Sequence, residues 1–244
     1  AVSVAGDFNG WDPRAHPLRS LGPSGVWNGF VPGAGEGARY KFAIAAADGA
    51  LLWKADPFAA RTLPPPETAS VVHRPSYRFR FQAQRHPEPH RRPMSVYEVH
   101  LGSWRRVPEE GERSLTYREI APRLAAYVSD MGFTHVEFLP VMEHPFGGSW
   151  GYQVGGFFAP TARYGSPDDF AFLVDTLHAA GIGVILDWVG AHFPRDDFSL
   201  GRFDGTSLYE HLDPRRGIHP DWGTFVFNHG RHEVQSMLIS NANY

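Results

Sequence analysis

Asp187 and His192 are the residues whose types and spacing most directly suggest chemistry. Asp187 ends the short run 183–187, whose composition predicts a buried parallel strand, and His192 follows in the next loop. A carboxylate and an imidazole at the carboxyl end of a parallel strand lie where α/β enzymes place binding and catalytic groups. A strand-capping aspartate followed by an unrelated loop histidine would give the same pattern, so this stretch alone leaves both interpretations open.

Residues 94–244 alternate between predicted strands and helices, which would position Asp187. The expected strands are 95–101, 134–139 and 183–187. The first two helices begin at the capping residues Thr116 and Ser166, and the third begins near Arg231. Their expected apolar faces are Ile120, Leu124, Val128 and Met131; Phe170, Leu173, Val174 and Leu177; and Val234, Met237 and Leu238. This order demands a parallel sheet with right-handed crossovers, and the long loops after two strands favour an incomplete (β/α)8 TIM barrel of about three β/α units.

Residues 1–85 have a different pattern, which predicts an immunoglobulin-like β-sandwich. Short alternating runs are separated by Gly- and Pro-rich turns, and the runs are VSVAGDF, VWNGFV, ARYKFAIAA, LLWKA, SVV and YRFRF. Residues 86–93 are rich in Pro, His and Arg and predict a linker between the domains 1–85 and 94–244. His86 and His90 lie in this linker, but the prolines between them forbid the helix that would align them on a metal.

Composition excludes several classes of function. The net charge of −3 gives no reason to expect a nucleic-acid partner, and no apolar run approaches the ~20 residues of a membrane span. The absence of cysteine excludes disulfides and thiolate metal sites and fits a cytoplasmic protein. We therefore expect no metal site, no cofactor and no membrane partner.

Two sets of motifs carry a family resemblance. The N-terminal set is GDFNGW at 6–11, VPG at 31–33, YKF at 40–42 and KADP at 54–57. The second set includes WGYQ at 150–153, DWV at 187–189, FDGT at 203–206, LYE at 208–210 and HPDWG at 219–223. Together they resemble the bacterial 1,4-α-glucan branching enzymes of the α-amylase clan, whose barrel follows a glycogen-binding module. Two positions depart from that pattern: Gly190 replaces a proline, and Asn243 replaces an apolar residue, which would place a polar group on or beside a buried helix face.

The resemblance assigns a sugar platform to the N-terminal domain. In glycogen-binding members two tryptophans and a lysine form it, and the matching positions are Trp11, Lys41 and Trp53. Indole faces stack on sugar C–H groups, and an ammonium group donates to hydroxyls. The same tryptophans could instead fill the sandwich or its contact with the next domain, so a purely structural role stays open.

The resemblance also assigns residues at the barrel rim. By match, Asp187 and His192 bind the glucose unit at the cleavage point, and Tyr152 stacks against the same sugar. Trp150 is expected to line that pocket. His100 either touches sugar or makes a structural hydrogen bond, whereas the simpler interpretation of the neighbouring acids, Asp196 and Asp197, is a solvated surface.

The resemblance implies a retaining double displacement that needs two carboxyl groups. Their expected positions follow strands four and five, beyond Tyr244, so no catalytic residue is assigned and this chain alone is predicted to be inactive. The expected function is that of an N-terminal part of a branching enzyme, which cleaves α-1,4 bonds and forms α-1,6 bonds in glycogen, with α-glucans as partners. We expect the parent protein to be a monomer or small oligomer. The alternatives are another glucan-active enzyme of the clan, of trehalohydrolase or debranching type, and a non-catalytic glucan-binding protein.

Overall fold

The N-terminal module is built around a central antiparallel strand. The computed structural model describes residues 1–80 and 91–244. The strands of the module are β1 (Val2–Gly6), β2 (Arg19–Ser20), β3 (Trp27–Asn28), β4 (Arg39–Ala45), β5 (Leu51–Lys54) and β6 (Ser70–Val71). Strand β4 pairs with β1, β5 and β6, while β2 and β3 form a separate two-stranded sheet. The module is thus rich in β-structure, as predicted, and the immunoglobulin-like sandwich remains a prediction.

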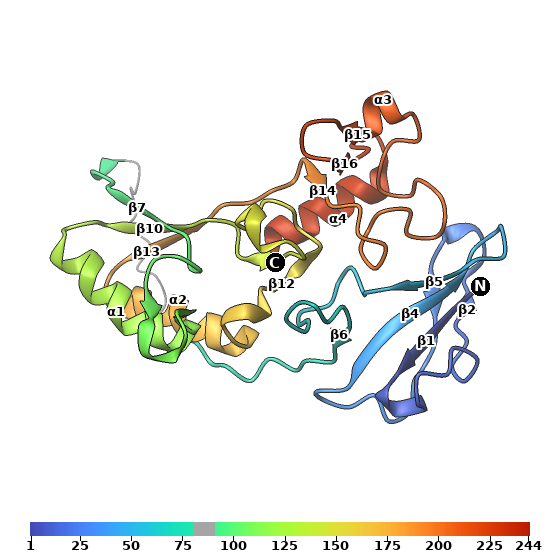
Figure 1. The fold of residues 1–244 in the computed structure, drawn as a ribbon, viewed down its shortest axis with the longest axis horizontal. Helices are drawn as coiled ribbons and strands as arrows, with labels where there is room; N and C mark the ends of the chain where they lie inside the picture. Colours follow the sequence, from blue (N-terminus) through green and yellow to red (C-terminus); the bar gives the residue numbers. More distant parts are fainter. Residues whose placement is uncertain (81–90) are drawn as a thin grey trace.

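One predicted strand of the module is wrong. The alternating run at 77–81 forms no strand over residues 77–80. The chain instead leaves β6 and runs toward α2 of the second part (Figure 1), where the Tyr77 hydroxyl donates to Oδ2 of Asp175 at 2.7 Å. The backbone N–H and hydroxyl of Ser76 also donate to Asp168 in the first turn of the same helix. Tyr77 therefore contacts that helix and not a neighbouring strand, and the domain boundary at residue 85 remains a prediction.

The second part begins with three parallel strands, as expected for the start of a (β/α)8 barrel. They are β7 (Val96–Val99), β10 (His135–Phe138) and β13 (Gly183–Leu186), with β10 in the middle. Helix α1 (Tyr117–Asp130) joins the first two, and α2 (Pro167–Ala179) precedes the third. The core between strands and helices includes Ile120, Leu124, Val128, Val136, Phe138, Leu173 and Leu177.

The helix caps follow the sequence closely. Thr116 and Glu119 form the expected capping box of α1, and Ser166 and Asp169 form that of α2. The predicted apolar face of α1 is too long by one residue, because Met131 is the C-cap and is 55 % exposed. The strand β13 was also expected to be buried, yet it is the edge of the three-stranded sheet and Leu186 is 48 % exposed.

The connections after these strands carry further short elements. They are β8 (Arg106–Val107), β9 (Arg113–Ser114), β11 (Met142–Glu143), β12 (Gly156–Pro160), β14 (His192–Phe193), α3 (Pro214–Gly217), β15 (Ile218–His219), β16 (Thr224–Val226) and α4 (His232–Asn243). Short 3₁₀-helices lie at Asp7–Asn9, Gly22–Ser24, Pro108–Glu110, Gly147–Ser149 and Ala162–Tyr164. Val234, Met237 and Leu238 of α4 are buried, as predicted. Asn243 is exposed, so the expectation of a polar group on or beside a buried helix face is wrong.

Hydrogen bonds join the module to the loops of the second part. The buried ammonium group of Lys54 donates to the main-chain oxygens of Asp197 at 2.5 Å and Gly201 at 2.7 Å. Elsewhere the hydroxyl of Thr62 donates to Oε2 of buried Glu143 at 3.0 Å. These contacts place β5 directly against the loop that follows β14. Within residues 1–80 and 91–244, no helix is long and apolar enough to cross a membrane.

Candidate functional site

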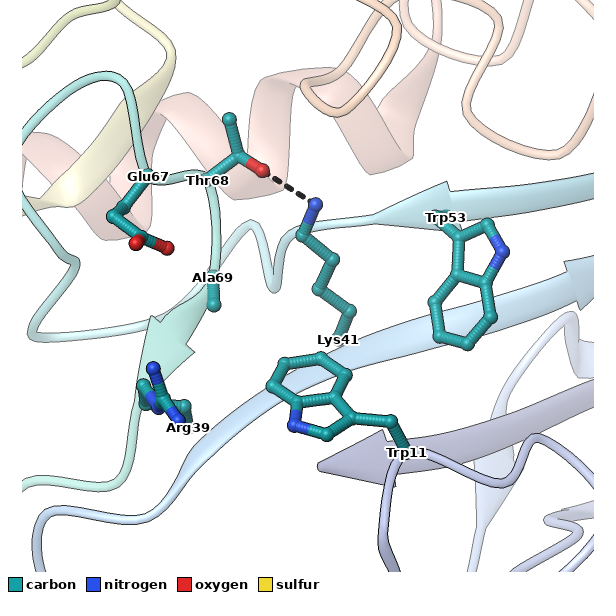
Figure 2. Close-up of a pocket in the computed structure, with 7 residues that line it drawn as sticks. All are labelled: Trp11, Arg39, Lys41, Trp53, Glu67, Thr68 and Ala69. Carbon is teal, nitrogen blue, oxygen red and sulfur yellow. Dashed lines mark hydrogen bonds between the residues drawn. The ribbon is translucent and has the colours of Figure 1, made fainter. Parts of the chain in front are cut away.

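Trp11, Lys41 and Trp53 line one cavity on the module. Its volume is about 310 Å³, and its remaining lining residues are Arg39, Glu67, Thr68 and Ala69. Figure 2 shows both indoles beside the Lys41 side chain, which points toward Thr68. The structure therefore brings together all three residues that the sequence assigns to the sugar platform.

Strand pairing explains why two of these side chains meet. Residues two apart on a strand share a face, and residues paired across antiparallel strands share a face. Lys41 and Ala43 are two apart on β4, and Ala43 is paired with Trp53 on β5. Lys41 and Trp53 therefore project from the same side of the sheet. The same rule adds Arg39, a lining residue that lies outside the family motifs but is two positions from Lys41 on β4, a spacing that could have identified it from the sequence.

Trp11 is held in place by an ion pair. Its backbone has a φ of 63°, and its indole Nε1 donates to Oδ1 of Asp7 at 3.1 Å. The Arg39 guanidinium donates to both oxygens of that carboxylate at 3.0 Å. Hydrogen bonds from Arg39 are the main cause that lowers the pKa of Asp7 to about 2. Asp7 thus stays ionised and keeps accepting from the indole over the ordinary pH range.

Lys41 supplies an ammonium group to the cavity. Its Nζ donates to Oγ1 of Thr68 at 2.5 Å and lies 5.9 Å from the ring centre of Phe198. Partial burial lowers the pKa of Lys41. Flat apolar faces beside an ammonium, a hydroxyl and the carboxylate of Glu67 offer both stacking and hydrogen bonding, which is the mixture that a sugar ring needs.

A second candidate site lies at the carboxyl ends of the parallel strands. The Tyr152 hydroxyl donates to Oδ2 of Asp187 at 2.7 Å, so two of the predicted rim residues meet. Gly151 makes this approach possible, because its φ is 93° and a Cβ there would collide with the carbonyl oxygen of Pro140. The bond to Asp187 is the main cause that raises the pKa of Tyr152 to about 12.

Trp150 and His100 form the neighbouring part of this rim. Their rings are stacked with centres 5.3 Å apart and an angle of 23° between the planes. Nδ1 of His100 also lies 2.8 Å from the hydroxyl of Ser103, which is a structural hydrogen bond. Burial lowers the pKa of His100, so its ring is favoured as neutral. Because Trp150 is 56 % exposed, it keeps a free aromatic surface beside Tyr152.

His192 belongs to a different cluster. It is buried, and its ring centre lies 6.1 Å from His219 and 5.1 Å from Trp222. Within the described parts of the chain, no hydrogen bond or ion pair joins His192 to Asp187. The structure therefore brings Tyr152 to Asp187 but shows no direct contact between Asp187 and His192, and the binding of one glucose unit by all three residues stays a prediction.

The remaining candidates are Asp196, Asp197, His86 and His90. Asp196 and Asp197 are exposed, and each accepts a hydrogen bond through its main-chain oxygen, from Ser199 and Lys54 respectively. His86 and His90 lie outside the described residues. Among the residues that the structure does describe, no cluster of three His, Asp or Glu could hold a metal ion.

Comparisons with known proteins find relatives of both parts of the chain. Residues 1–59 match the family model of carbohydrate-binding module 48 (isoamylase N-terminal domain), and residues 117–200 match that of the alpha amylase catalytic domain. A 1,4-alpha-glucan branching enzyme of Myxococcus xanthus is 60% identical over 99% of this chain, which covers 34% of that protein. The branching enzyme of Thermobifida fusca is 61% identical over 99% of this chain, covering 32% of the relative.

A solved structure has a fold similar to that of this chain. The crystal structure of a putative alpha amylase from Salmonella typhimurium aligns with a TM-score of 0.68 and 23% sequence identity. The alignment covers 98% of this chain and 37% of that one. The described architecture is therefore a β-rich module followed by the start of a TIM barrel. The chain spans about a third of the length of the curated relatives that it matches.

Proposed function

Because the chain belongs to the family of 1,4-alpha-glucan branching enzymes, we propose that it binds the α-glucan chains on which such an enzyme acts. The observation that carries this proposal is the cavity shared by Trp11, Lys41 and Trp53. A glucan chain lies across the two indoles and accepts a hydrogen bond from the Lys41 ammonium. At the barrel rim, Asp187 accepts from a glucose hydroxyl while Tyr152, Trp150 and His100 provide the adjoining surface.

The proposed reaction of the whole protein is transfer within a glucan. An α-1,4 bond is cleaved by a retaining mechanism, and the released segment is rejoined through an α-1,6 bond. The nucleophile and the general acid are proposed to lie after strands four and five of the complete barrel, so no residue of this chain takes either role. The role proposed for Asp187, His192 and Tyr152 is to bind the glucose unit on which the nucleophile and the general acid act.

Identity near 60% to branching enzymes over almost the whole chain favours this function over the trehalohydrolase and debranching alternatives. The same proposal includes the remaining expectations from the sequence. These are an immunoglobulin-like sandwich, about three barrel units, the domain boundaries 1–85 and 94–244, a cytoplasmic location, and a complete protein that is a monomer or small oligomer. A non-catalytic glucan-binding protein would use the same module cavity. An assay of branching by the complete protein separates the two, because only the enzyme changes the linkage of its glucan.

Retention on immobilised amylose tests the module site. We expect the Trp11→Ala/Trp53→Ala variant to lose about tenfold or more in affinity, since two stacking surfaces are removed. Trp27→Ala is the matched control, because Trp27 is 38 % exposed on β3 and does not line the cavity. Equal retention of the double variant and the control would overturn the assignment of this cavity.

A further inference from the structure

Three polar side chains share one face of the small sheet β14–β16–β15. His192 on β14 pairs with Val226, and His219 on β15 pairs with Thr224. Thr224 and Val226 are two apart on β16, so their side chains project from one side. Because paired residues of antiparallel strands share a face, His192, Thr224 and His219 all project from that same side.

Each of these side chains has a buried atom without a partner. Nδ1 of His192, Nδ1 of His219 and Oγ1 of Thr224 make no hydrogen bond to any part of the chain that the structure describes. His192 and Thr224 are 7 % and 1 % exposed. A buried polar atom without a partner destabilises a fold, and three on one face indicate a ligand that completes them.

Trp222 covers this face. Its ring stacks on His219 with centres 4.4 Å apart and planes at 24°, and it also contacts His192. The indole is nevertheless 58 % exposed, because it lies in the tight turn between β15 and β16. The backbone N–H of Gly223 closes that turn by donating to the oxygen of His219 at 2.8 Å. Trp222 therefore has one side on the imidazoles and another side free.

We propose that His219, Thr224 and Trp222 form a further glucan subsite beside His192. The inference rests on the proposed function, since it extends the sugar site to residues to which neither the family motifs nor the module cavity assign a role. A glucose ring enters between the indole and the imidazoles, stacks on the indole, and bonds through its hydroxyls to the atoms that lack partners. Entry of the sugar shifts Trp222 away from the imidazoles.

The chemistry of the three groups suits a hydroxylated ligand. Burial, and secondarily the charge of His219, lowers the pKa of His192, so its imidazole is favoured as neutral. A neutral imidazole offers one donor and one acceptor, and a threonine hydroxyl offers both, which complements a sugar hydroxyl. Two imidazoles and a hydroxyl lack the carboxylates that a hard cation would require.

Calorimetric titration with maltoheptaose tests the proposal in the 244-residue chain carrying Trp11→Ala and Trp53→Ala. We expect this background to keep binding maltoheptaose through the barrel part, at the rim residues and at the new subsite. Adding Thr224→Val, which keeps the side-chain shape, should weaken this binding about threefold to tenfold without lowering the melting temperature. Adding His219→Phe should weaken it similarly, because a ring that can stack remains but the nitrogen is lost. Thr176→Val is the matched control, because the Thr176 hydroxyl bonds only within α2.

The outcomes separate this inference from the module assignment. No binding in the background variant, or unchanged affinity after Thr224→Val, would overturn the further subsite and leave the module cavity in place. If the Trp11→Ala/Trp53→Ala changes removed no site from the original chain, the module assignment would fail, while a Thr224-dependent site would still support the subsite.

Discussion

The ammonium group of Lys54 lies 2.7 Å from the main-chain oxygen of Gly201, across the junction of the module and the barrel. The same group donates to Asp197, so one side chain fixes both ends of a five-residue stretch of loop. Lys54 is next to Trp53 on β5, and neighbouring residues of a strand point to opposite faces. One strand therefore presents Trp53 to the sugar cavity and Lys54 to the loop that follows His192.

We expect Lys54→Met to lower the free energy of unfolding by about 2 kcal/mol, because two carbonyl oxygens lose a charged donor. The measurement is scanning calorimetry together with limited proteolysis, which should cut the loop at 197–201 faster. Lys54→Arg is the conservative control, since it keeps a charge and several donors but not the compact ammonium. Unchanged stability and unchanged proteolysis of Lys54→Met would contradict this role.

The elements that could be predicted are those specified by neighbouring residues. Thr116 and Ser166 cap their helices through residues three positions later, and the parallel strands follow from short apolar runs. The junction could not be predicted in this way. Lys54 contacts a loop more than 140 residues away, and Tyr77 meets α2 through an alternation that is typical of a strand.

The residues of the candidate site could likewise be predicted only in part. Trp11, Lys41 and Trp53 lie in or next to recognisable family motifs, and the pairing of β4 with β5 brings Lys41 and Trp53 to one face. Glu67 and Thr68 come from the segment before β6 and carry no motif, so only the fold shows that they complete the cavity.

Asp7→Asn should weaken glucan binding by the module. The neutral amide loses the charge-assisted bonds from Arg39 and leaves the Trp11 indole less firmly held, so we expect a loss of about threefold to tenfold. Maltoheptaose titration measures it, with Asp12→Asn as the control, because Asp12 also pairs with an arginine but lies outside the cavity. Equal affinities of the two variants would show that the ion pair does not orient Trp11.

The Asp7 carboxylate also gives this site a defined response to acid. Its pKa is lowered to about 2, so its contribution is complete above the ordinary aspartate pKa and is lost only as the pH falls through about 2. Trp11 fluorescence, measured as the difference from the Trp11→Phe variant, should therefore be constant from neutral pH down to about 4. A transition of this signal between pH 4 and 7 would be incompatible with the ion pair.

The Tyr152–Asp187 contact predicts a shift at high pH. With a pKa of about 12, the hydroxyl of Tyr152 keeps donating below the ordinary tyrosine pKa of about 10, and the stabilisation disappears as the pH rises through 12. We expect the Tyr152 ring signal in an NMR titration to shift its midpoint toward 10 in Asp187→Asn. The Asp196→Asn variant, which changes an exposed acid of the next loop, should leave the midpoint unchanged.

Gly190 departs from the proline expected in its motif, and the structure explains what a side chain would do there. A Cβ at this position would collide with the far end of the Trp188 indole. Trp188 is 44 % exposed, so the ring can turn away, but its Nε1 would then lose the bond to Oδ1 of Asn241 at 2.7 Å. Nδ2 of Asn241 also donates to the oxygen of Phe157, which ties α4 to β12.

We therefore expect Gly190→Ala to reduce the free energy of unfolding by about 1 kcal/mol, the usual contribution of one such hydrogen bond. Gly147→Ala is the matched control, because a Cβ there meets no atom within 4 Å, and it should be neutral or slightly stabilising. In a Trp188→Leu background the indole is already absent, so Gly190→Ala should cost nothing further. A cost that persists there would mean that the backbone of 188–191, and not the indole, requires glycine.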